Sequence, residues 1–341
     1  MRRFLAVAML GVVLVSTSGA ALAGKDLDAV KARGTLICGV AAGGIAGFMM
    51  VDSQGKWTGL DVDICRATAA AIFGDSEKVK YAPLSGQTRF TALQSGEVDV
   101  LSNNSTWTLT RDSALGLDFV GVTYYDGQGF MVPKKLGVKS AKEMNGASIC
   151  VPSGSTTELN VADYFRAMKM IFKPVIFEDA DQIRGAFFSG RCQAYTTDAS
   201  GLASVRNKEA GNPDDHVILP DLISKEPLGP AVRRGDDEFY AIVKWVVFAL
   251  IEAEEYGITQ ANVDQMKSST DPVVQRILGT SEDTGKLLGL DKDWAYRAIK
   301  ATGNYGEIFE NNVGPKSALK LPRGMNNLWN KGGIMYAPPV R

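Results

Sequence analysis

This chain of 341 residues has little histidine, no CxxC motif and almost no net charge. His216 is the single histidine, and no two of the four cysteines form a CxxC pair, so the usual zinc-binding patterns are missing. Lys and Arg number 37 against 38 Asp and Glu, a formal net charge of −1. Such a balance gives no reason to expect nucleic acid or an acidic membrane surface as a partner. We expect neither a metal nor a cofactor.

The sequence also lacks two common catalytic patterns. It contains no GxxxxGK[ST] loop, so we do not expect it to hydrolyse ATP, and no GxSxG elbow for a nucleophilic serine. The glycines at positions 43, 44 and 47 do not have the GxGxxG spacing. They predict a turn, or a backbone wall beside a ligand, and not a phosphate-binding loop.

Long apolar runs are missing as well, and the one at the N-terminus is short. Arg2 and Arg3 precede an apolar run at 4–15, and the run 21–23 (ALA) fits a small-x-small cleavage site. A membrane span needs about 20 apolar residues, so a permanent anchor is the weaker interpretation. Residues 1–23 are predicted to be a secretory signal peptide that directs the protein to the periplasm. Because there is no cysteine near the cleavage site, we do not expect a lipid anchor.

An exported protein can form disulfides from its four cysteines. Four thiols allow three pairings, and the sequence alone cannot choose among them. Their order along the chain favours Cys38 with Cys65 and Cys150 with Cys192, one bridge per lobe. The alternative is four buried thiols.

The apolar pattern alternates between strands and helices twice along the chain. Strands are predicted at 36–40, 79–83 and 98–101 with helices between them, and again at 147–151, 174–177 and 192–196 around helices at 155–170 and 181–189. This order is typical of parallel sheets with crossover helices, and it predicts two similar α/β lobes.

The segment 124–132 joins aromatic strand residues to two glycines and is predicted to cross between the lobes, with 217–219 as a candidate return crossing. A core helix is expected at 236–254, because Lys244 interrupts its apolar run. The predicted division is a first lobe at 24–126 and 223–270, a second lobe at 127–222, and an extension at 271–341 that packs on the lobes.

One stretch is rich in groups that suit a small zwitterion. Residues 103–111 (NNSTWTLTR) follow a predicted strand and end in Arg111. The planar guanidinium matches a carboxylate in a bidentate manner, and hydroxyls and amides add hydrogen bonds without charge. The plainer interpretation is a surface turn with one solvated arginine.

Several stretches together resemble the polar amino-acid-binding proteins of bacterial ABC importers, which are solute-binding proteins of family 3, and most of all the general L-amino-acid-binding type. The stretches are GLDVDICRATAAAIFG, ALQSGEVDVLSNNSTWTLTRD, LDFVGVTYYDGQGFMV, VPSGSTTE and GRCQAYTTD. The resemblance covers nearly the whole mature chain. It implies a periplasmic binding protein fold, in which two α/β lobes joined by a two-strand hinge close on a ligand in the cleft between them.

The resemblance also implies the roles of individual residues. It places the carboxylate-binding arginine at Arg111, first-lobe contacts at 103–106, with Asn103, Asn104 and Thr106 as candidates, a second-lobe carboxylate contact at Thr156 beside Ser155, and the acid for the ligand's ammonium group at Asp198.

Two of these candidates have a physical basis and also a plainer explanation. Ser155 and Glu158 have the spacing of a capping box at a helix start, where N–H groups and the helix dipole attract a carboxylate. The plainer explanation is an ordinary cap, and Asp198 could likewise be an N-cap.

The expected function is capture of a free L-amino acid by a monomer that delivers it to membrane permease subunits. The loop 41–48 carries no charge, which favours a broad or polar preference over selection for Lys or Arg. One alternative is an exported dehydratase or lyase on the same fold, which would need a general acid or base in the cleft. Another is a ligand-sensing module.

Overall fold

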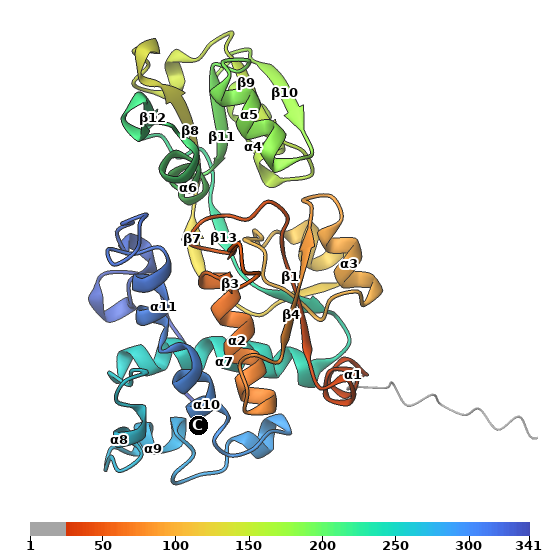
Figure 1. Cartoon of the computed structure of the whole chain (residues 1–341), viewed down its shortest axis with the longest axis vertical. Coiled ribbons are helices and arrows are strands. Elements are labelled where there is room, and N and C mark those ends of the chain that lie inside the picture. The colour runs from red at the N-terminus through yellow and green to blue at the C-terminus, as the bar shows by residue number, and fades with distance from the viewer. Residues whose placement is uncertain (1–24) are drawn as a thin grey trace, which may run out of the picture.

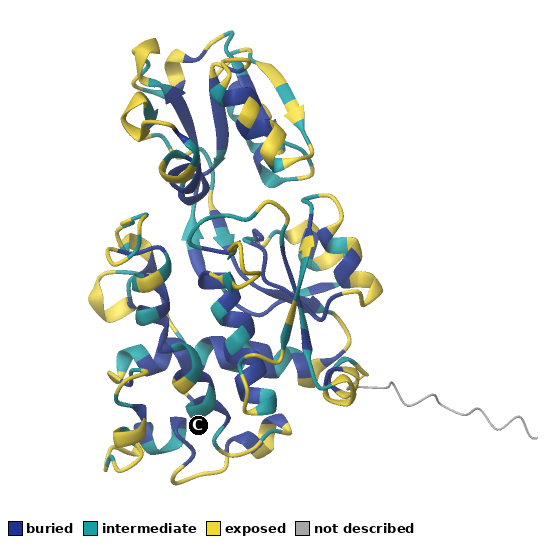
Figure 2. Cartoon of the chain, in the orientation of Figure 1, coloured by how far each residue is buried: buried dark blue, intermediate teal, exposed yellow. Residues whose placement is uncertain are grey.

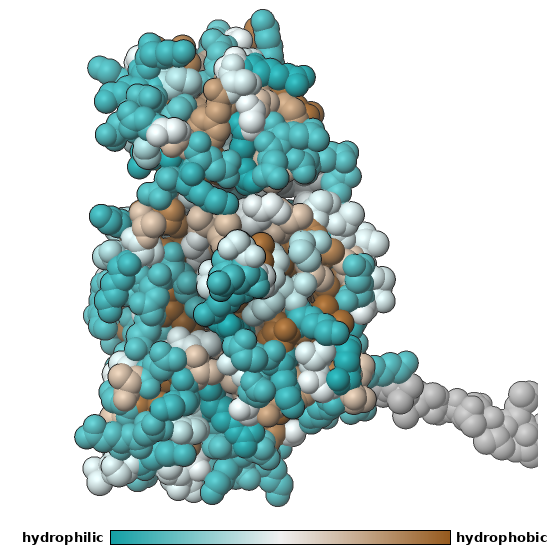
Figure 3. All heavy atoms as spheres, in the orientation of Figure 1, coloured by the Kyte–Doolittle hydropathy of each residue, from teal (hydrophilic) through white to brown (hydrophobic). Residues whose placement is uncertain are grey.

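The structure is a computed structural model that describes residues 25–341, so the predicted signal peptide at 1–23 lies outside the described residues. The described chain begins with α1 (Lys25–Arg33) and forms two α/β lobes stacked along the long axis of the molecule (Figure 1). The face seen in Figure 3 is mainly hydrophilic. Within residues 25–341, the helices are all too short or too polar to cross a membrane.

The first lobe is built on a mixed sheet of five strands in the order β4-β1-β5-β14-β6. These strands are β1 (Leu36–Ala41), β4 (Val79–Leu84), β5 (Val100–Leu101), β6 (Leu117–Phe119) and β14 (Ala231–Arg233). Strand β1 pairs in parallel with β4 and β5, as the sequence predicted, and β14 pairs antiparallel with β5 and β6. The crossovers contain the hairpin β2 (Met50–Val51) and β3 (Trp57–Thr58) and the helices α2 (Leu60–Phe73) and α3 (Arg89–Ser95).

The second lobe repeats this plan with the strand order β10-β9-β11-β8-β12. Its strands are β8 (Gln128–Pro133), β9 (Ser148–Pro152), β10 (Lys173–Phe177), β11 (Ala194–Asp198) and β12 (His216–Ile218), and its helices are α4 (Thr156–Ala167), α5 (Ala180–Phe188) and α6 (Ala199–Glu209). Helix α4 ends three residues before its predicted end, where Lys169 adopts a left-handed conformation with φ 54°. The predicted alternation of strands and helices is therefore present in both lobes.

A two-stranded antiparallel ribbon joins the lobes. It consists of β7 (Tyr124–Asp126) and β13 (Glu226–Leu228), which pair directly (Figure 1). The first crossing was predicted in this place, but the return crossing at 217–219 was wrong. Val217 and Ile218 belong to β12, which extends the second sheet beside β8. A short apolar run fits an edge strand as well as a crossing, so the pattern could not separate the two.

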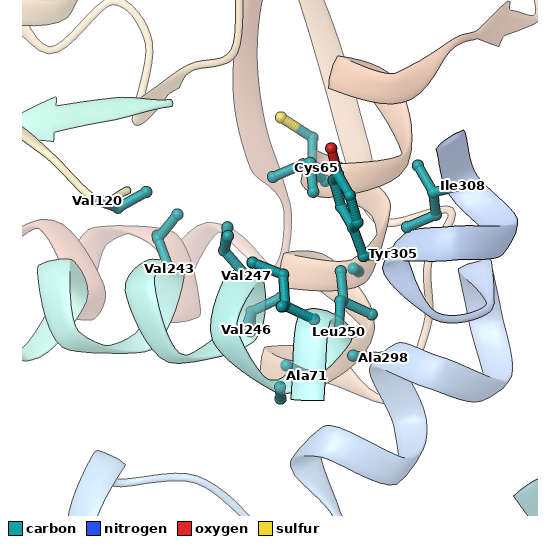
Figure 4. Packing of buried hydrophobic residues seen from close by; sticks show 14 of the residues in the cluster. Cys65, Ala71, Val120, Val243, Val246, Val247, Leu250, Ala298, Tyr305 and Ile308 are labelled. Carbon is teal, nitrogen blue, oxygen red and sulfur yellow. The ribbon is translucent and has the colours of Figure 1, made fainter. Parts of the chain in front are cut away.

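The C-terminal segment packs on the first lobe. Helix α7 (Asp237–Glu255) returns across that lobe, followed by α8 (Val263–Met266), α9 (Pro272–Ile277), α10 (Trp294–Thr302) and α11 (Tyr305–Asn312). Helices α10 and α11 lie against α2 and α7, and Figure 4 shows Val246, Leu250, Ala298 and Tyr305 meeting in their shared core. The inner faces of α2 and α7 are accordingly buried (Figure 2).

Each lobe contains one disulfide, in the pairing that the order of the cysteines favoured. Cys38 of β1 is bonded to Cys65 of α2, and Cys150 of β9 is bonded to Cys192, which lies just before β11. Each bridge therefore ties neighbouring elements of one lobe together, and neither crosses the hinge.

Candidate functional site

A cavity of about 210 Å³ lies between the lobes. Residues that follow β1, β4 and β5 line it from the first lobe, and residues that end or follow β9, β10 and β11 line it from the second. Ligands of open α/β sheets bind beyond the carboxyl ends of the strands, and here two sets of such ends face one another. Of the predicted site residues, the cavity is lined by Asn103, Asn104, Thr106, Ser155, Thr156 and Asp198.

Asn104 bridges the cleft because a buried aspartate holds its backbone. Asp61, at the start of α2, accepts hydrogen bonds from the hydroxyl of Ser102 at 2.7 Å and from the N–H of Asn104 at 3.2 Å. Burial raises the pKa of Asp61 to about 6. Asn104 adopts a left-handed conformation with φ 47°, and its amide group donates to Asp198 of the other lobe at 3.4 Å.

Asp198 ends β11 and is the N-cap residue of α6, but its side chain caps no N–H group of the helix. The carboxylate is buried and faces the cleft. Burial raises its pKa well above the ordinary value, and the neighbouring carboxylates of Asp126 and Glu226 raise it further, while Arg89 and Arg111 oppose the shift. Asp198 therefore occupies the predicted N-cap position, but its side chain does not act as the cap. An uncapped, buried carboxylate in a cleft suits a cationic partner.

Arg111 lies directly behind the cavity wall. It belongs to a π-helical turn (Thr110–Ala114), and its guanidinium donates to the carbonyl of Thr106 at 2.8 Å. The guanidinium carbon lies 4.7 Å from the ring centre of Phe90, and the side chain is buried. Burial lowers the pKa of Arg111, whereas Glu226 and Asp198 raise it, so the three charges share one region. Arg111 is not among the residues that line the cavity.

Arg89 is a second guanidinium, which the sequence reasoning missed, and it does line the cavity. It donates to the carbonyl and side-chain oxygens of Asn103 at 3.3 and 3.2 Å, and it lies against the ring of Phe90, as Arg111 does. Burial, together with Arg111, lowers the pKa of Arg89 to about 9. One signal was available: Arg89 opens helix α3, where the helix dipole disfavours a cation unless another group compensates.

The capping box predicted at Ser155 is wrong. Ser155 is the N-cap residue of α4, but its hydroxyl donates to the carbonyl of Pro152 at 2.6 Å and accepts no hydrogen bond from the helix. Glu158 accepts from the N–H of Gly154 at 3.3 Å and not from the N-cap residue. The side chains of Ser155 and Glu158 therefore both form hydrogen bonds with the tight turn at 152–155 and not with each other's backbone. The first turn of α4, which begins at Thr156, therefore faces the cavity without a side-chain cap.

On the first-lobe side of the cavity, three buried polar atoms of lining residues have no hydrogen-bond partner within residues 25–341. They are Nε of Arg89, Nδ2 of Asn103 and Oδ1 of Asn104. Buried polar groups in folded proteins are nearly always paired. Their clustering on one wall indicates a place where a polar ligand completes the hydrogen bonding.

Direct contacts between the lobes surround the cavity. The N–H of Ala46 donates to the hydroxyl of Ser204 at 2.8 Å, and the amide group of Gln87 donates to the hydroxyl of Ser153 at 3.0 Å. The single histidine is elsewhere: His216 lies on β12 against Phe187 and Phe188 and does not line the cavity. The geometry defines a two-lobed protein that encloses a small polar ligand between its halves.

Comparisons with known proteins agree with this class. Residues 36–262 match the family model for bacterial extracellular solute-binding proteins, family 3, and the chain belongs to this family. It is 57% identical over 343 residues to the general L-amino acid-binding periplasmic protein AapJ of Rhizobium johnstonii, covering all of both chains. It is 55% identical to the glutamate/glutamine/aspartate/asparagine-binding protein BztA of Rhodobacter capsulatus, covering 97% of each chain.

A solved structure extends the likeness to three dimensions. The periplasmic binding protein of an ABC transporter from Brucella ovis, with glutathione bound, is 58% identical and superposes with a TM-score of 0.90. The match covers 92% of this chain and 99% of that one. A match of this extent must include most of the C-terminal segment beyond residue 262, which the family model does not reach.

Proposed function

We propose that this protein is the periplasmic, amino-acid-binding component of an ABC importer. The observation that carries the proposal is the meeting, in one cavity between two lobes, of a first-lobe guanidinium, Arg89, and a buried second-lobe carboxylate, Asp198, with the guanidinium of Arg111 close by. A free amino acid has the opposite charges at one end of the molecule. AapJ and BztA are named for binding amino acids, which supports the same reading of this cavity.

The proposed contacts divide between the lobes. A guanidinium of the first lobe binds the ligand's α-carboxylate, with Arg111 as the candidate that the family resemblance implies, and Asp198 binds the ammonium group. Asn103, Asn104 and Thr106 add hydrogen bonds from the first lobe. In the second lobe, the backbone N–H groups at Ser155 and Thr156 do so at the start of α4, where the helix dipole favours a carboxylate. The ligand stabilises closure because it contacts both lobes only when they are together.

Arg89 supports a preference within the amino acids. It adds a second buried guanidinium that lines the cavity itself, and a guanidinium pairs well with a carboxylate or a carboxamide oxygen. We therefore propose a broad specificity that includes Asp, Glu, Asn and Gln, the four amino acids in the name of BztA. The uncharged loop at 41–48 gives no counter-charge for Lys or Arg side chains.

The partner proposed for the closed form is the permease of the same importer, which receives the amino acid. We further propose a first lobe at 24–126 and 223–270, a second lobe at 127–222, and an extension at 271–341, a division that the position of the β7–β13 ribbon supports. The enzyme alternative would need a general acid or base placed for chemistry, and the ligand-sensing alternative would need a signalling partner in place of a permease.

Titration calorimetry with the purified mature protein tests the proposal. The panel contains the twenty L-amino acids, D-glutamate and D-glutamine as controls, and glutathione, whose glutamyl end has the same pair of charged groups. We expect binding of several polar L-amino acids, with Glu and Gln among them, and no conversion of the ligand. Absence of binding across the panel would contradict the proposal, and a reaction product would favour the enzyme alternative.

A further inference from the structure

Glu226 occupies an unusual position in the hinge. It lies on β13, is 1% exposed, and its backbone pairs with Asp126 of the other hinge strand. No cation contacts it within the described part of the chain. Its carboxylate instead accepts four hydrogen bonds from neutral groups, which fills the acceptor capacity of an ionised carboxylate.

The four donors come from both lobes and from the hinge. Oε2 accepts from the hydroxyl of Thr106, in the first lobe, at 2.5 Å and from the hydroxyl of Thr156, in the second lobe, at 3.0 Å. Oε1 accepts from the amide group of Asn160 at 2.7 Å and from the hydroxyl of Ser224 at 2.5 Å. The two threonine oxygens are only 3.4 Å apart, and both residues line the cavity. One oxygen of a hinge carboxylate thus joins one hydroxyl from each side of the cleft.

We propose that Glu226 is a positioning residue that fixes the hydroxyl protons of Thr106 and Thr156 and so determines which end of the ligand these oxygens recognise. A carboxylate can only accept, so each hydroxyl must direct its proton toward Glu226. Each threonine oxygen then offers lone pairs alone to the cavity. These oxygens are acceptors, and they suit the ammonium group beside Asp198 and not the α-carboxylate. The proposal rests on the amino-acid-binding function proposed above.

The arrangement also links recognition to closure. Thr106 and Thr156 reach the same oxygen atom from different lobes, so opening the hinge must separate at least one of them from Glu226. The acceptor pair therefore exists only when the lobes are together.

The test compares two ligands that differ only at the ammonium group: L-glutamate and L-2-hydroxyglutarate, in which a hydroxyl replaces it. Calorimetry gives the ratio of their dissociation constants for the wild type, for Glu226→Gln and for Glu252→Gln. Glu252 is a matched control, since it is also a buried glutamate and accepts a hydrogen bond from the N–H of Val340, but it lies in α7 away from the cavity.

We expect Glu226→Gln to weaken L-glutamate binding roughly tenfold or more, because an amide has one acceptor oxygen and cannot serve both pairs of donors. The preference for L-glutamate over the hydroxy acid should fall as well, since an amide N–H facing the threonines would turn their protons toward the ligand. Glu252→Gln should keep the wild-type ratio. An unchanged ratio in Glu226→Gln, with or without equal weakening of both ligands, would overturn the proposal.

A second pair of variants keeps Glu226 in place and guards against a folding defect. Thr156→Ser retains a hydroxyl and should keep the ligand preference, whereas Thr156→Val should reduce it. Equal preference in these two variants would overturn the proposal even if Glu226→Gln did not fold. Absence of L-glutamate binding by the wild type, within a panel where other amino acids bind, would exclude this ligand pair as the preferred one and move the comparison to L-alanine and L-lactate. No amino-acid binding at all would overturn both proposals.

Discussion

Asn326 of the C-terminal segment caps the hinge strand at Tyr125. Its side-chain oxygen accepts from the N–H of Tyr125 at 2.6 Å, and its amide group donates to the carbonyl of the same residue at 3.1 Å. Tyr125 is opposite Pro227 in the ribbon, and proline has no N–H to offer. One asparagine thus supplies the outer edge of β7 with both hydrogen bonds that a third strand would give.

Removing this cap should loosen the hinge. Asn326→Ala leaves a partly buried N–H and C=O without a protein partner, which costs on the order of 1–3 kcal/mol where water cannot replace the bonds. We expect a lower thermal unfolding midpoint and faster hydrogen exchange at the amide of Tyr125. Asn330→Ala is the control, because Asn330 is exposed in the same segment. Equal exchange rates at Tyr125 in the two variants would show that Asn326 does not stabilise the hinge.

The two guanidinium groups should contribute differently to binding. Arg111→Ala removes the proposed carboxylate partner and also the bond to the carbonyl of Thr106, so we expect no detectable binding of any amino acid. Arg89→Ala should weaken the binding of Glu and Asp by roughly tenfold or more but that of Ala and Ser by much less, since the smaller ligands lack a side-chain carboxylate. Calorimetry with the four ligands checks both. Uniform weakening by Arg89→Ala would exclude its proposed role in specificity.

Binding should depend on pH through Asp198. Burial and the carboxylates of Asp126 and Glu226 raise the pKa of Asp198 in the free protein, with Arg89 and Arg111 opposing. The ligand's ammonium group favours the ionised form, so its binding lowers that pKa and releases protons. Affinity should therefore fall as the pH decreases through the raised pKa of Asp198.

Calorimetry in two buffers of different ionisation enthalpy measures this proton release directly. Asp198→Asn should bind weakly and release no protons. Proton release that persists in Asp198→Asn would assign the effect to another group.

The disulfide of the second lobe should contribute substantially to stability. Cys150 and Cys192 are buried and separated by 42 residues. A bridge that closes a loop of this size contributes about 3–4 kcal/mol in the chain-entropy model. In the double variant Cys150→Ala/Cys192→Ala, the free energy of unfolding should be lower by about this amount. The midpoint of urea unfolding should accordingly lie at a lower concentration than in the wild type. An unchanged midpoint would show that the native packing of α5 and β9 suffices without the bridge.

Local patterns predicted the lobes well because strands and crossover helices bury contiguous apolar runs. The disulfide pairing followed the order of the cysteines because each bridge closes within one lobe. The prediction that the return crossing lies at 217–219 was wrong for a physical reason. Glu226-Pro227-Leu228 has a charge and a proline where a strand is expected, and its β-structure depends on partners that are about 100 residues away.

The lining of the cavity was predicted in part. The sequence indicated Asn104, Thr106 and Asp198, and the cleft brings these three together. It missed Arg89 because a lone arginine in a helix is ordinarily exposed, and it missed Glu226 because hinge residues are distinguished only by contacts across the cleft. The prediction of a capping box at Ser155 was wrong because the side chains of Ser155 and Glu158 bond to the tight turn before the helix. The spacing of the two residues cannot reveal this competition.

The most direct test of the account is a crystal structure of the mature protein with bound L-glutamate. The account predicts one ligand molecule in the cavity between the lobes, with its ammonium group within hydrogen-bonding distance of Asp198 and its α-carboxylate held by an arginine of the first lobe. A ligand bound outside this cavity, or one whose ammonium group faces the arginines, would contradict it.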